Sequence, residues 1–172
     1  NYTYFTTPVI DTITPQVGDV NGGTVITVDG HNFAAAAAGS MRCRWGATWD
    51  TGFTYHNSTR VFCTSPLASA KAVVEVDLTL NDQDFTQNGR RFWYHDDISV
   101  DYLLPWHGPM DGRSEIQVFL TGKGANWEPT QQMQAVARCK FGTVDVEARW
   151  VLPNLLACRV PSTTSAGAVN VE

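Results

Sequence analysis

The chain has 172 residues, which is long for one small domain and sufficient for two domains of about 90 residues each. Apolar residues make up 43% of the sequence, well above the fraction in disordered chains, and the net charge is −5. An acidic chain is a poor partner for nucleic acid or anionic lipid. No apolar run reaches the roughly 18 residues that a membrane-spanning helix requires, so we expect no direct membrane insertion of this segment.

The first clear strand pattern follows the pair Gly22–Gly23, which predicts a tight turn with positive φ. Ile26 and Val28 then alternate with polar residues, the period expected of a strand with one buried face. Gly30 is predicted to end this strand. The run Ala34–Ala38 is too short to form a lone helix in water, so we interpret it as a loop.

A second alternating strand spans residues 74–80, where Val and Leu occupy the even positions. Glu75, Asp77 and Thr79 lie between them, so the pattern predicts an apolar face toward a core and a polar face toward water. Turn-forming residues separate such runs at intervals of roughly 8 to 15 residues, as in a β-sandwich. With no amphipathic helical pattern, the sequence predicts an all-β protein.

The second half of the chain repeats the landmarks of the first. The matching pairs, 90 to 96 positions apart, are Pro15 and Pro105, Gly30 and Gly122, Arg42–Gly46 and Arg138–Gly142, and Cys63–Pro66 and Cys158–Pro161. Ile116, Val118 and Leu120 also alternate with polar residues, as in the first strand. The repetition predicts one supersecondary plan used twice, with insertions in the loops.

This repetition sets the expected domain boundaries. We expect an arm or the end of a preceding repeat at 1–7, one β-sandwich at 8–95 and a second at 96–172. Tyr2–Phe5 is similar to the strand that closes the first domain. By the same spacing, Val169–Glu172 corresponds to residues 74–77, so the second domain is expected to lack its closing strands, and we expect at least three such domains in the parent chain.

The cysteines fall into two pairs with similar spacing. Cys43 and Cys63 are 20 positions apart, and Cys139 and Cys158 are 19 apart. Because neither a C-x-x-C motif nor a nearby histidine pair is present, this spacing indicates one disulfide per repeat rather than a zinc site. Four buried free thiols are the alternative.

Two N-x-[ST] sequons, at Asn1 and Asn57, are candidate N-glycosylation sites. Sequons beside paired cysteines favour an oxidising compartment, so we expect an extracellular protein, either secreted or at the cell surface.

The motifs resemble those of a known family. They are Gly-Gly-Thr-x-Ile-Thr-Val-x-Gly-x-Asn-Phe at 22–33, Cys-x-Trp-Gly at 43–46, Cys-x-Ser-Pro at 63–66 and Phe-x-Tyr at 92–94. Together they are similar to the IPT/TIG family, immunoglobulin-like domains of plexins, related receptors and some transcription factors. The resemblance is close from Pro8 to Tyr94 and looser over 99–172. It implies tandem immunoglobulin-like β-sandwiches but decides little about function, because members of the family have many different functions.

Candidate chemistry is sparse. The four histidines lie at predicted turns, and none has a serine, cysteine or carboxylate at a known catalytic spacing, so we expect no enzyme and no cofactor. His95–Asp97 and Asn81–Asp84 offer oxygen ligands that calcium prefers, but neither matches a defined calcium loop. We interpret both as solvated turn residues and expect no metal site.

Aromatic and basic residues suggest contact surfaces. Trp45 shares its strand parity with Cys43 and is predicted to pack inward on the disulfide. Trp93 and Trp106 flank the segment 95–105, which we interpret as the domain junction, and both are candidate interface residues. Arg42, Arg44 and Arg60 are predicted to share an outward face of neighbouring strands; they do not form the basic stripe of a nucleic-acid binder.

We interpret the chain as a non-enzymatic extracellular module of structural or adhesive type, part of a multi-domain rod, filament subunit or stalk. Its expected partners are neighbouring domains of the same chain and other protein subunits, without nucleic acid. A segment of a plexin-like receptor ectodomain is the first alternative. An accessory carbohydrate-binding domain of a secreted enzyme, or an intracellular dimerisation domain of a transcription factor, would also be compatible with the pattern.

Overall fold

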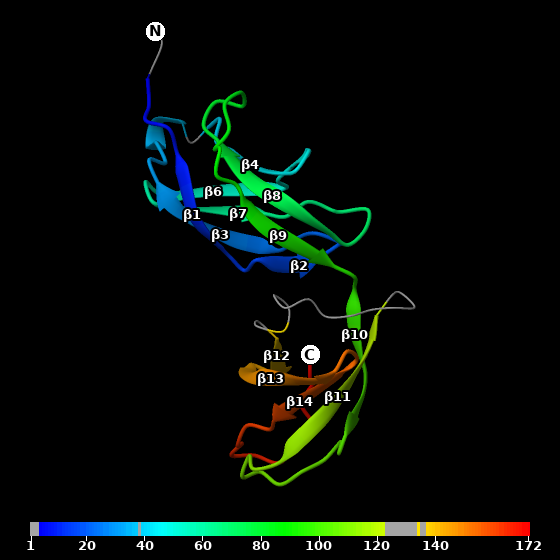
Figure 1. The fold of residues 1–172 in the computed structure, drawn as a ribbon. Coiled ribbons are helices and arrows are strands. Elements are labelled where there is room, and N and C mark those ends of the chain that lie inside the picture. Colours follow the sequence, from blue (N-terminus) through cyan, green and yellow to red (C-terminus); the bar gives the residue numbers. More distant parts are fainter. Residues whose placement is uncertain (1–3, 38, 123–133, 135–136) are drawn as a thin grey trace. The chain divides into compact units, whose positions relative to one another are not determined.

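The computed structural model describes residues 4–37, 39–122, 134 and 137–172 (Figure 1). It divides into two compact units, Asn1–His95 and Asp96–Glu172. The strands of the first unit are β1 (Val9–Thr14), β2 (Val17–Asp19), β3 (Val25–His31), β4 (Arg42–Trp45), β5 (Thr48–Trp49), β6 (Gly52–Asn57), β7 (Arg60–Thr64), β8 (Ala72–Thr79) and β9 (Arg90–His95). Those of the second are β10 (Ile98–Leu104), β11 (Glu115–Gly122), β12 (Arg138–Phe141), β13 (Val144–Leu152) and β14 (Leu155–Arg159).

The first unit is a sandwich of two sheets, with strand orders β1-β3-β7-β6 and β2-β9-β8-β4-β5. Ile26 and Val28 are fully buried, so the alternation in β3 has the predicted orientation. Residues from both sheets form one core: Ile10, Ile13, Ile26, Val28 and Val61 from the first, and Cys43, Trp45, Val76, Leu78, Phe92 and Tyr94 from the second. The two sheets therefore have the arrangement of an immunoglobulin-like sandwich.

A disulfide joins the two sheets of this sandwich. Cys43 lies on β4 and Cys63 on β7, their sulfur atoms are bonded, and their Cα atoms are 6.2 Å apart. Trp45 is only 2% exposed, as its parity with Cys43 predicts, and its ring meets Phe92 edge-on at 6.2 Å between centroids. The link thus connects strands at the centre of the core.

The second unit repeats this plan. Strands β10, β11, β14 and β13 are ordered as β1, β3, β7 and β6 are. Strand β12 carries the first cysteine, as β4 does, and pairs with β13 at the end of the same five-stranded sheet. Cys139 on β12 is bonded to Cys158 on β14, the counterpart of the first disulfide. Phe141 is 7% exposed beside it, as predicted. The fold is therefore a tandem pair of immunoglobulin-like β-sandwiches.

The last residues of the chain pair with β12. Val171 lies opposite Phe141, and the amide of Gly142 donates to the carbonyl of Asn170 at 2.9 Å. In the first unit Trp45 lies opposite Val76 and Gly46 donates to Glu75 at 2.8 Å. The register is therefore the one expected from the sequence correspondence between the two segments.

Two local predictions were wrong. Strand β3 continues through Gly30 to His31, because these two residues pair with Ile10 and Val9 of β1. Asp77 and Thr79 do not face water but are 8% and 0% exposed, because the loop between β8 and β9 folds back over this strand. Within the alanine run, predicted as a loop, Ala35–Ala37 form a short 3-10 turn, η1.

The glycine pair forms the predicted turn, with φ of 76° at Gly22 and 81° at Gly23. The two positions differ in their surroundings. A β-carbon on Gly22 would lie 2.7 Å from the carbonyl carbon of Pro66, whereas one on Gly23 would meet nothing within 4 Å. In the second unit Gly112 also has a positive φ, 69°, and a β-carbon there would crowd the backbone of Ser162.

This difference yields a matched pair of variants. Gly23→Ala should cost about 1–2 kcal/mol of unfolding free energy, because only the left-handed backbone is penalised. Gly22→Ala should cost about 1–3 kcal/mol more, because the β-carbon also pushes the backbone at Pro66 aside. Urea unfolding of both variants checks this. Equal losses in the two variants would contradict the assigned crowding.

Tyr94 is a buried titratable group of the first core. Its hydroxyl donates to the Pro66 carbonyl at 2.9 Å, and burial raises the pKa of Tyr94 to about 12. Tyr94→Phe should destabilise the protein at pH 7 by about 1–3 kcal/mol, because the buried carbonyl loses its donor. Urea unfolding measures this loss.

The same variant tests the pKa. In the unfolded chain Tyr94 ionises near 10, so the unfolded state releases its proton first. The contribution of the protonated Tyr94 phenol to the unfolding free energy is fully present below pH 10. It is lost as the pH rises toward about 12. The advantage of the wild type over Tyr94→Phe should therefore shrink across this window. An advantage that stays constant up to pH 12 would contradict the raised pKa.

Candidate functional site

A loop between β8 and β9 covers the outward face of one sheet in the first unit. The amide of Thr86 donates to the Leu78 carbonyl at 2.9 Å, and the Thr86 hydroxyl accepts from the Leu78 amide at 3.0 Å. Phe85 also forms an isolated bridge with Thr79. This cover explains why Asp77 and Thr79 are buried although the alternation of β8 directs them away from the core.

Under the loop, Arg44 is held by a carboxylate and by an aromatic ring. Its Nη2 lies 2.9 Å from Oδ2 of Asp77, and its Cζ lies 3.6 Å from the ring centroid of Phe85. Trp49 is on the other side of the cluster, with its ring centroid 5.7 Å from that of Phe85. A half-buried guanidinium between a carboxylate and a ring face is strongly fixed in position.

The cluster extends toward solvent. Arg42 lies 4.9 Å from the ring centroid of Trp49, and its Nε is 3.1 Å from Oδ1 of Asp82. Burial raises the pKa of Asp50, an effect that the nearby charge of Arg42 partly offsets. We call Arg42, Arg44, Trp49, Asp77 and Phe85 the arginine–aromatic cluster. It combines two cations, a carboxylate and two aromatic rings, and is a candidate contact surface.

Arg60 does not join this cluster. It lies on β7, in the other sheet, where Asp29 accepts from its Nε at 2.6 Å and from its Nη2 at 3.0 Å. The hydrogen bonds to Asp29 raise the pKa of Arg60. The prediction that Arg42, Arg44 and Arg60 share one face was wrong, because β4 and β7 belong to opposite layers.

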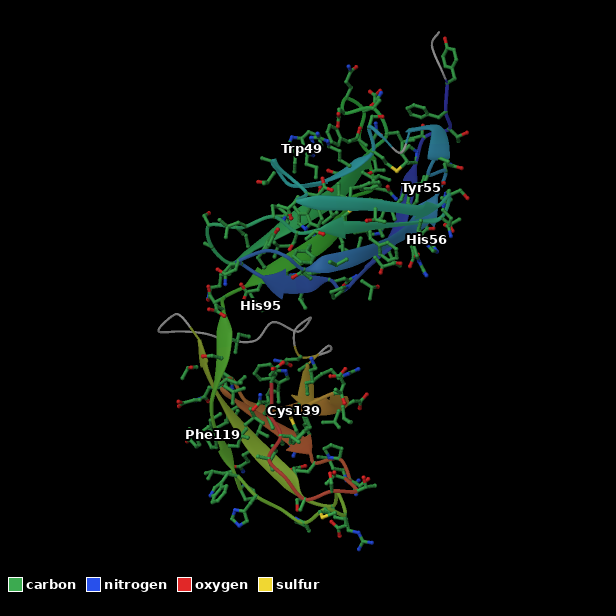
Figure 2. All side chains as sticks on the ribbon, turned by 180° about the vertical axis from the view of Figure 1, so that it is seen from behind. Trp49, Tyr55, His56, His95, Phe119 and Cys139 are labelled. Atoms are coloured by element: carbon green, nitrogen blue, oxygen red, sulfur yellow. A yellow bond between two sulfur atoms is a disulfide. The ribbon has the colours of Figure 1, made fainter. Side chains whose placement is uncertain are left out.

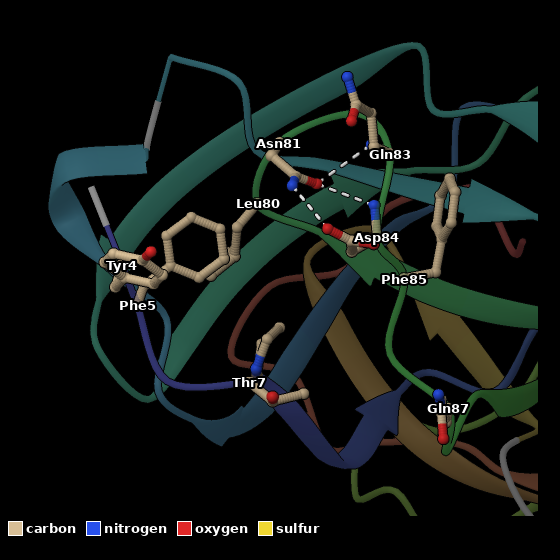
Figure 3. Close-up of a pocket in the computed structure, with 10 residues that line it drawn as sticks. Tyr4, Phe5, Thr7, Leu80, Asn81, Gln83, Asp84, Phe85 and Gln87 are labelled. Atoms are coloured by element: carbon tan, nitrogen blue, oxygen red, sulfur yellow. Dashed lines mark hydrogen bonds between the residues drawn. The ribbon is translucent and has the colours of Figure 1, made fainter. Parts of the chain in front are cut away.

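A pocket of about 450 Å³ lies beside the loop, between it and the N-terminal segment (Figure 3). Tyr4, Phe5, Thr7 and Pro8 line one part. The side chain of Asn81 organises the loop: its Oδ1 accepts from the amides of Gln83 and Asp84 at 3.1 and 2.8 Å, and its Nδ2 donates to Asp84 at 2.8 Å. The polar groups of Asn81 and Asp84 thus bind each other, as the turn interpretation predicts.

The second unit presents an aromatic pair on an outward sheet face. The rings of Tyr102 on β10 and Phe119 on β11 stack with centroids 4.2 Å apart and an interplanar angle of 13°. Figure 2 shows Phe119 on this unit, together with Cys139. Ile116 and Val118 on the same strand are buried in the core. The pair is a second candidate contact surface.

The two predicted interface tryptophans lie in different surroundings. Trp93 is half-buried on β9, opposite Val17 of β2 and Val73 of β8. Trp106 is 79% exposed and its ring meets that of His107 at 4.6 Å. Their roles as interface residues stay predictions.

The placement of Trp106 near the domain junction was wrong. Strand β9 ends at His95 and β10 begins at Ile98, so only residues 96 and 97 lie between them. The segment 98–104 is a strand, and Trp106 follows its far end, roughly 20 Å from its start at about 3.3 Å per residue.

The other tryptophans bear on carbohydrate binding, which would require several exposed rings in a row. Trp45 is buried, and Trp49, Trp93 and Trp150 are half-buried. Trp127 lies outside the described residues. Trp106 is thus the only exposed tryptophan among those the structure describes, and a row of stacking rings is not formed there.

His31 and His56 lie on separate strands of the first unit, β3 and β6. Nδ1 of His31 is 3.2 Å from Oδ2 of Asp11, with both side chains about half exposed, and His56 packs edge-on against Phe62. An exposed pair of this kind is an ordinary surface contact. In the described part of the chain, no three His, Cys, Asp or Glu side chains gather to hold a metal ion. No helix there is long and apolar enough to cross a bilayer.

Comparison with known proteins identifies the family. The model of the IPT/TIG domain matches residues 8–94. The chain belongs to the IPT/TIG domain family. Plexin-A3 of Rattus norvegicus and plexin-A3 of Mus musculus are each 24% identical to it over 115 residues, which are 66% of this chain and 6% of each plexin. The chain therefore spans a small fraction of these relatives.

Solved structures agree on the fold. The full extracellular region of plexin A4, solved in two crystal forms, superposes with TM-scores of 0.57 and 0.52 and with sequence identities of 18% and 16%. The match covers 95% of this IPT/TIG chain and 13% of the plexin chain in the first form. All four cysteines of the chain are bonded, and disulfides of this kind persist in oxidising compartments. The protein is therefore extracellular or at the cell surface.

The arginine–aromatic cluster was missed by sequence reasoning, although an aromatic residue isolated in the polar loop 81–88 was a usable signal.

A double-mutant cycle tests the contact between Arg44 and Phe85. Arg44→Met and Phe85→Leu should show a coupling of about 1–2 kcal/mol in unfolding free energy, because the cation and ring are in direct, half-buried contact. Urea unfolding at low and high salt measures the coupling.

The control cycle uses the exposed pair in the other sheet, Arg60→Met with Asp29→Asn. Its coupling should be smaller and should fall as salt is added, because solvent screens it. Additive effects of Arg44→Met and Phe85→Leu would show that the ring does not hold the guanidinium.

Proposed function

We propose that the chain is a segment of a plexin-like receptor ectodomain, in which tandem IPT/TIG domains serve as non-enzymatic supporting modules. The observation that carries this is the extent of the similarity to plexin-A3. It runs over 115 residues, whereas the first unit, Asn1–His95, is shorter than that. The shared stretch therefore includes residues of both units, which supports a tandem arrangement rather than a single domain.

We infer that the second unit is a second IPT/TIG copy, although the family match ends within the first. Several features that the family motif requires recur at equivalent places. Gly46 and Gly142 have φ of 57° and 61° after the buried aromatic residue, and each unit has a disulfide between equivalent strands. These are the features that a diverged copy retains, because they fix the backbone rather than the surface.

The supporting role follows from how such units are built. Each disulfide closes a loop of 20 or 19 residues, which by the loop-entropy model stabilises a domain by roughly 3 kcal/mol. The arginine–aromatic cluster and the aromatic pair of the second unit provide surfaces for neighbouring domains or protein subunits.

The test uses the full-length parent protein in its source cells, detected with antibodies against this chain. A receptor ectodomain predicts that the protein is labelled by a cell-impermeant reagent on intact cells and stays in membranes after carbonate washing. Release into the medium or by carbonate would overturn the receptor proposal and favour a secreted rod or filament subunit. Protein that is accessible only after lysis would overturn the extracellular role altogether.

A further inference from the structure

One sequon lies at the tip of a hairpin in the first unit. Strand β6 ends at Asn57 and β7 begins at Arg60, so Ser58 and Thr59 form the connection between them. All four residues are exposed. Figure 2 shows Tyr55 and His56 on the strand leading to this tip. The other sequon, at Asn1, lies outside the described residues.

The tip is held by the side chain of Asn57. Its Oδ1 accepts hydrogen bonds from the amide and from the hydroxyl of Thr59, both at 2.9 Å. The Nδ2 atom has no hydrogen-bond partner among the described residues. The oxygen of the side chain thus builds the turn, while the nitrogen is left for other chemistry.

The guanidinium of Arg60 does not cover the side chain of Asn57. Arg60 lies opposite Asn57 in the register of the hairpin, but its guanidinium is engaged by Asp29 through two hydrogen bonds. No residue of the hairpin tip is therefore required to move for a bulky group to be attached to Asn57.

From these contacts we propose that Asn57 carries an N-linked glycan. Asn-Ser-Thr is an acceptor triplet, and the structure exposes it in a protein of the compartment where such glycans occur. In the attachment, Nδ2 forms a bond to C1 of the first sugar of a lipid pyrophosphate-linked oligosaccharide. The C1–O bond to the pyrophosphate breaks, the lipid pyrophosphate leaves, and Nδ2 gives up one proton.

The position gives the glycan a physical role. The strand order β1-β3-β7-β6 makes β6 an edge strand, with one row of backbone groups unpaired by the sheet. Exposed edges pair readily with other chains unless something covers them. A glycan on the last residue of β6 obstructs this edge and leaves the opposite sheet, with the arginine–aromatic cluster, free for contacts. The inference does not depend on the receptor proposal, because a secreted rod has the same edge.

Peptide mapping tests the site directly. The chain is secreted from a eukaryotic cell line, purified and digested with trypsin. Cleavage after Arg44 and Arg60 isolates residues 45–60, which contain Asn57 but neither Asn1 nor any cysteine. We expect this peptide to carry the glycan, and enzymatic deglycosylation in heavy-oxygen water to convert Asn57 into labelled aspartate. A folded, secreted wild-type chain whose 45–60 peptide is unmodified would overturn the proposal.

Four variants separate attachment from folding. Asn57→Gln and Thr59→Ala both remove the acceptor triplet and should abolish the glycan on this peptide. Ser58→Ala and Thr59→Ser leave an acceptor triplet in place at the same turn and should retain it. Circular dichroism and disulfide mapping show that each secreted variant is folded. A glycan that persists on residues 45–60 of Asn57→Gln would place the modification elsewhere and contradict the assignment.

Discussion

One buried disulfide is the constraint on which each unit is built. Cys43 and Cys63 come from strands in opposite layers, and the buried residues of both sheets pack around the link. In the second unit, Cys139 and Cys158 join equivalent strands with nearly the same Cα separation, 6.3 Å. A cross-link at this point fixes which faces of the sheets meet, so the strands on either side have little freedom to change register. The aromatic residue two positions after the first cysteine then fills the space beside the sulfur atoms.

The two sheets of the first unit share this core but differ in their outward faces. One sheet of the first unit is covered by the loop between β8 and β9, which buries Asp77 and fixes Arg44 against Phe85. The opposite sheet keeps its polar outward face and ends in the Asn57 hairpin. The proposed contact surface and the proposed glycan therefore lie on different layers of the first unit.

Local sequence rules were reliable where one short-range requirement decided the structure. Gly22 and Gly23 have positive φ because the turn requires it, and Ile26 and Val28 are buried because a sandwich strand has one inward face. The rules failed where a distant segment intervened. Polar Asp77 was predicted to be solvated, and a loop that returns over β8 buries it. Trp106 was placed at the junction because the length of β10 could not be judged from its irregular sequence.

The sequence by itself determined the all-β class, the tandem plan, the spacing of the cysteines and the acceptor triplet at Asn57, since each depends on residues close together or on a pattern repeated along the chain. Only the tertiary structure decided which layer each arginine joins and what covers the outward face of β8. Those outcomes depend on how the strands assemble into layers: β4 and β7 lie in different sheets although both belong to the first unit. Alternation along a strand specifies the two faces, but it does not say which distant side chain or loop will lie against each of them.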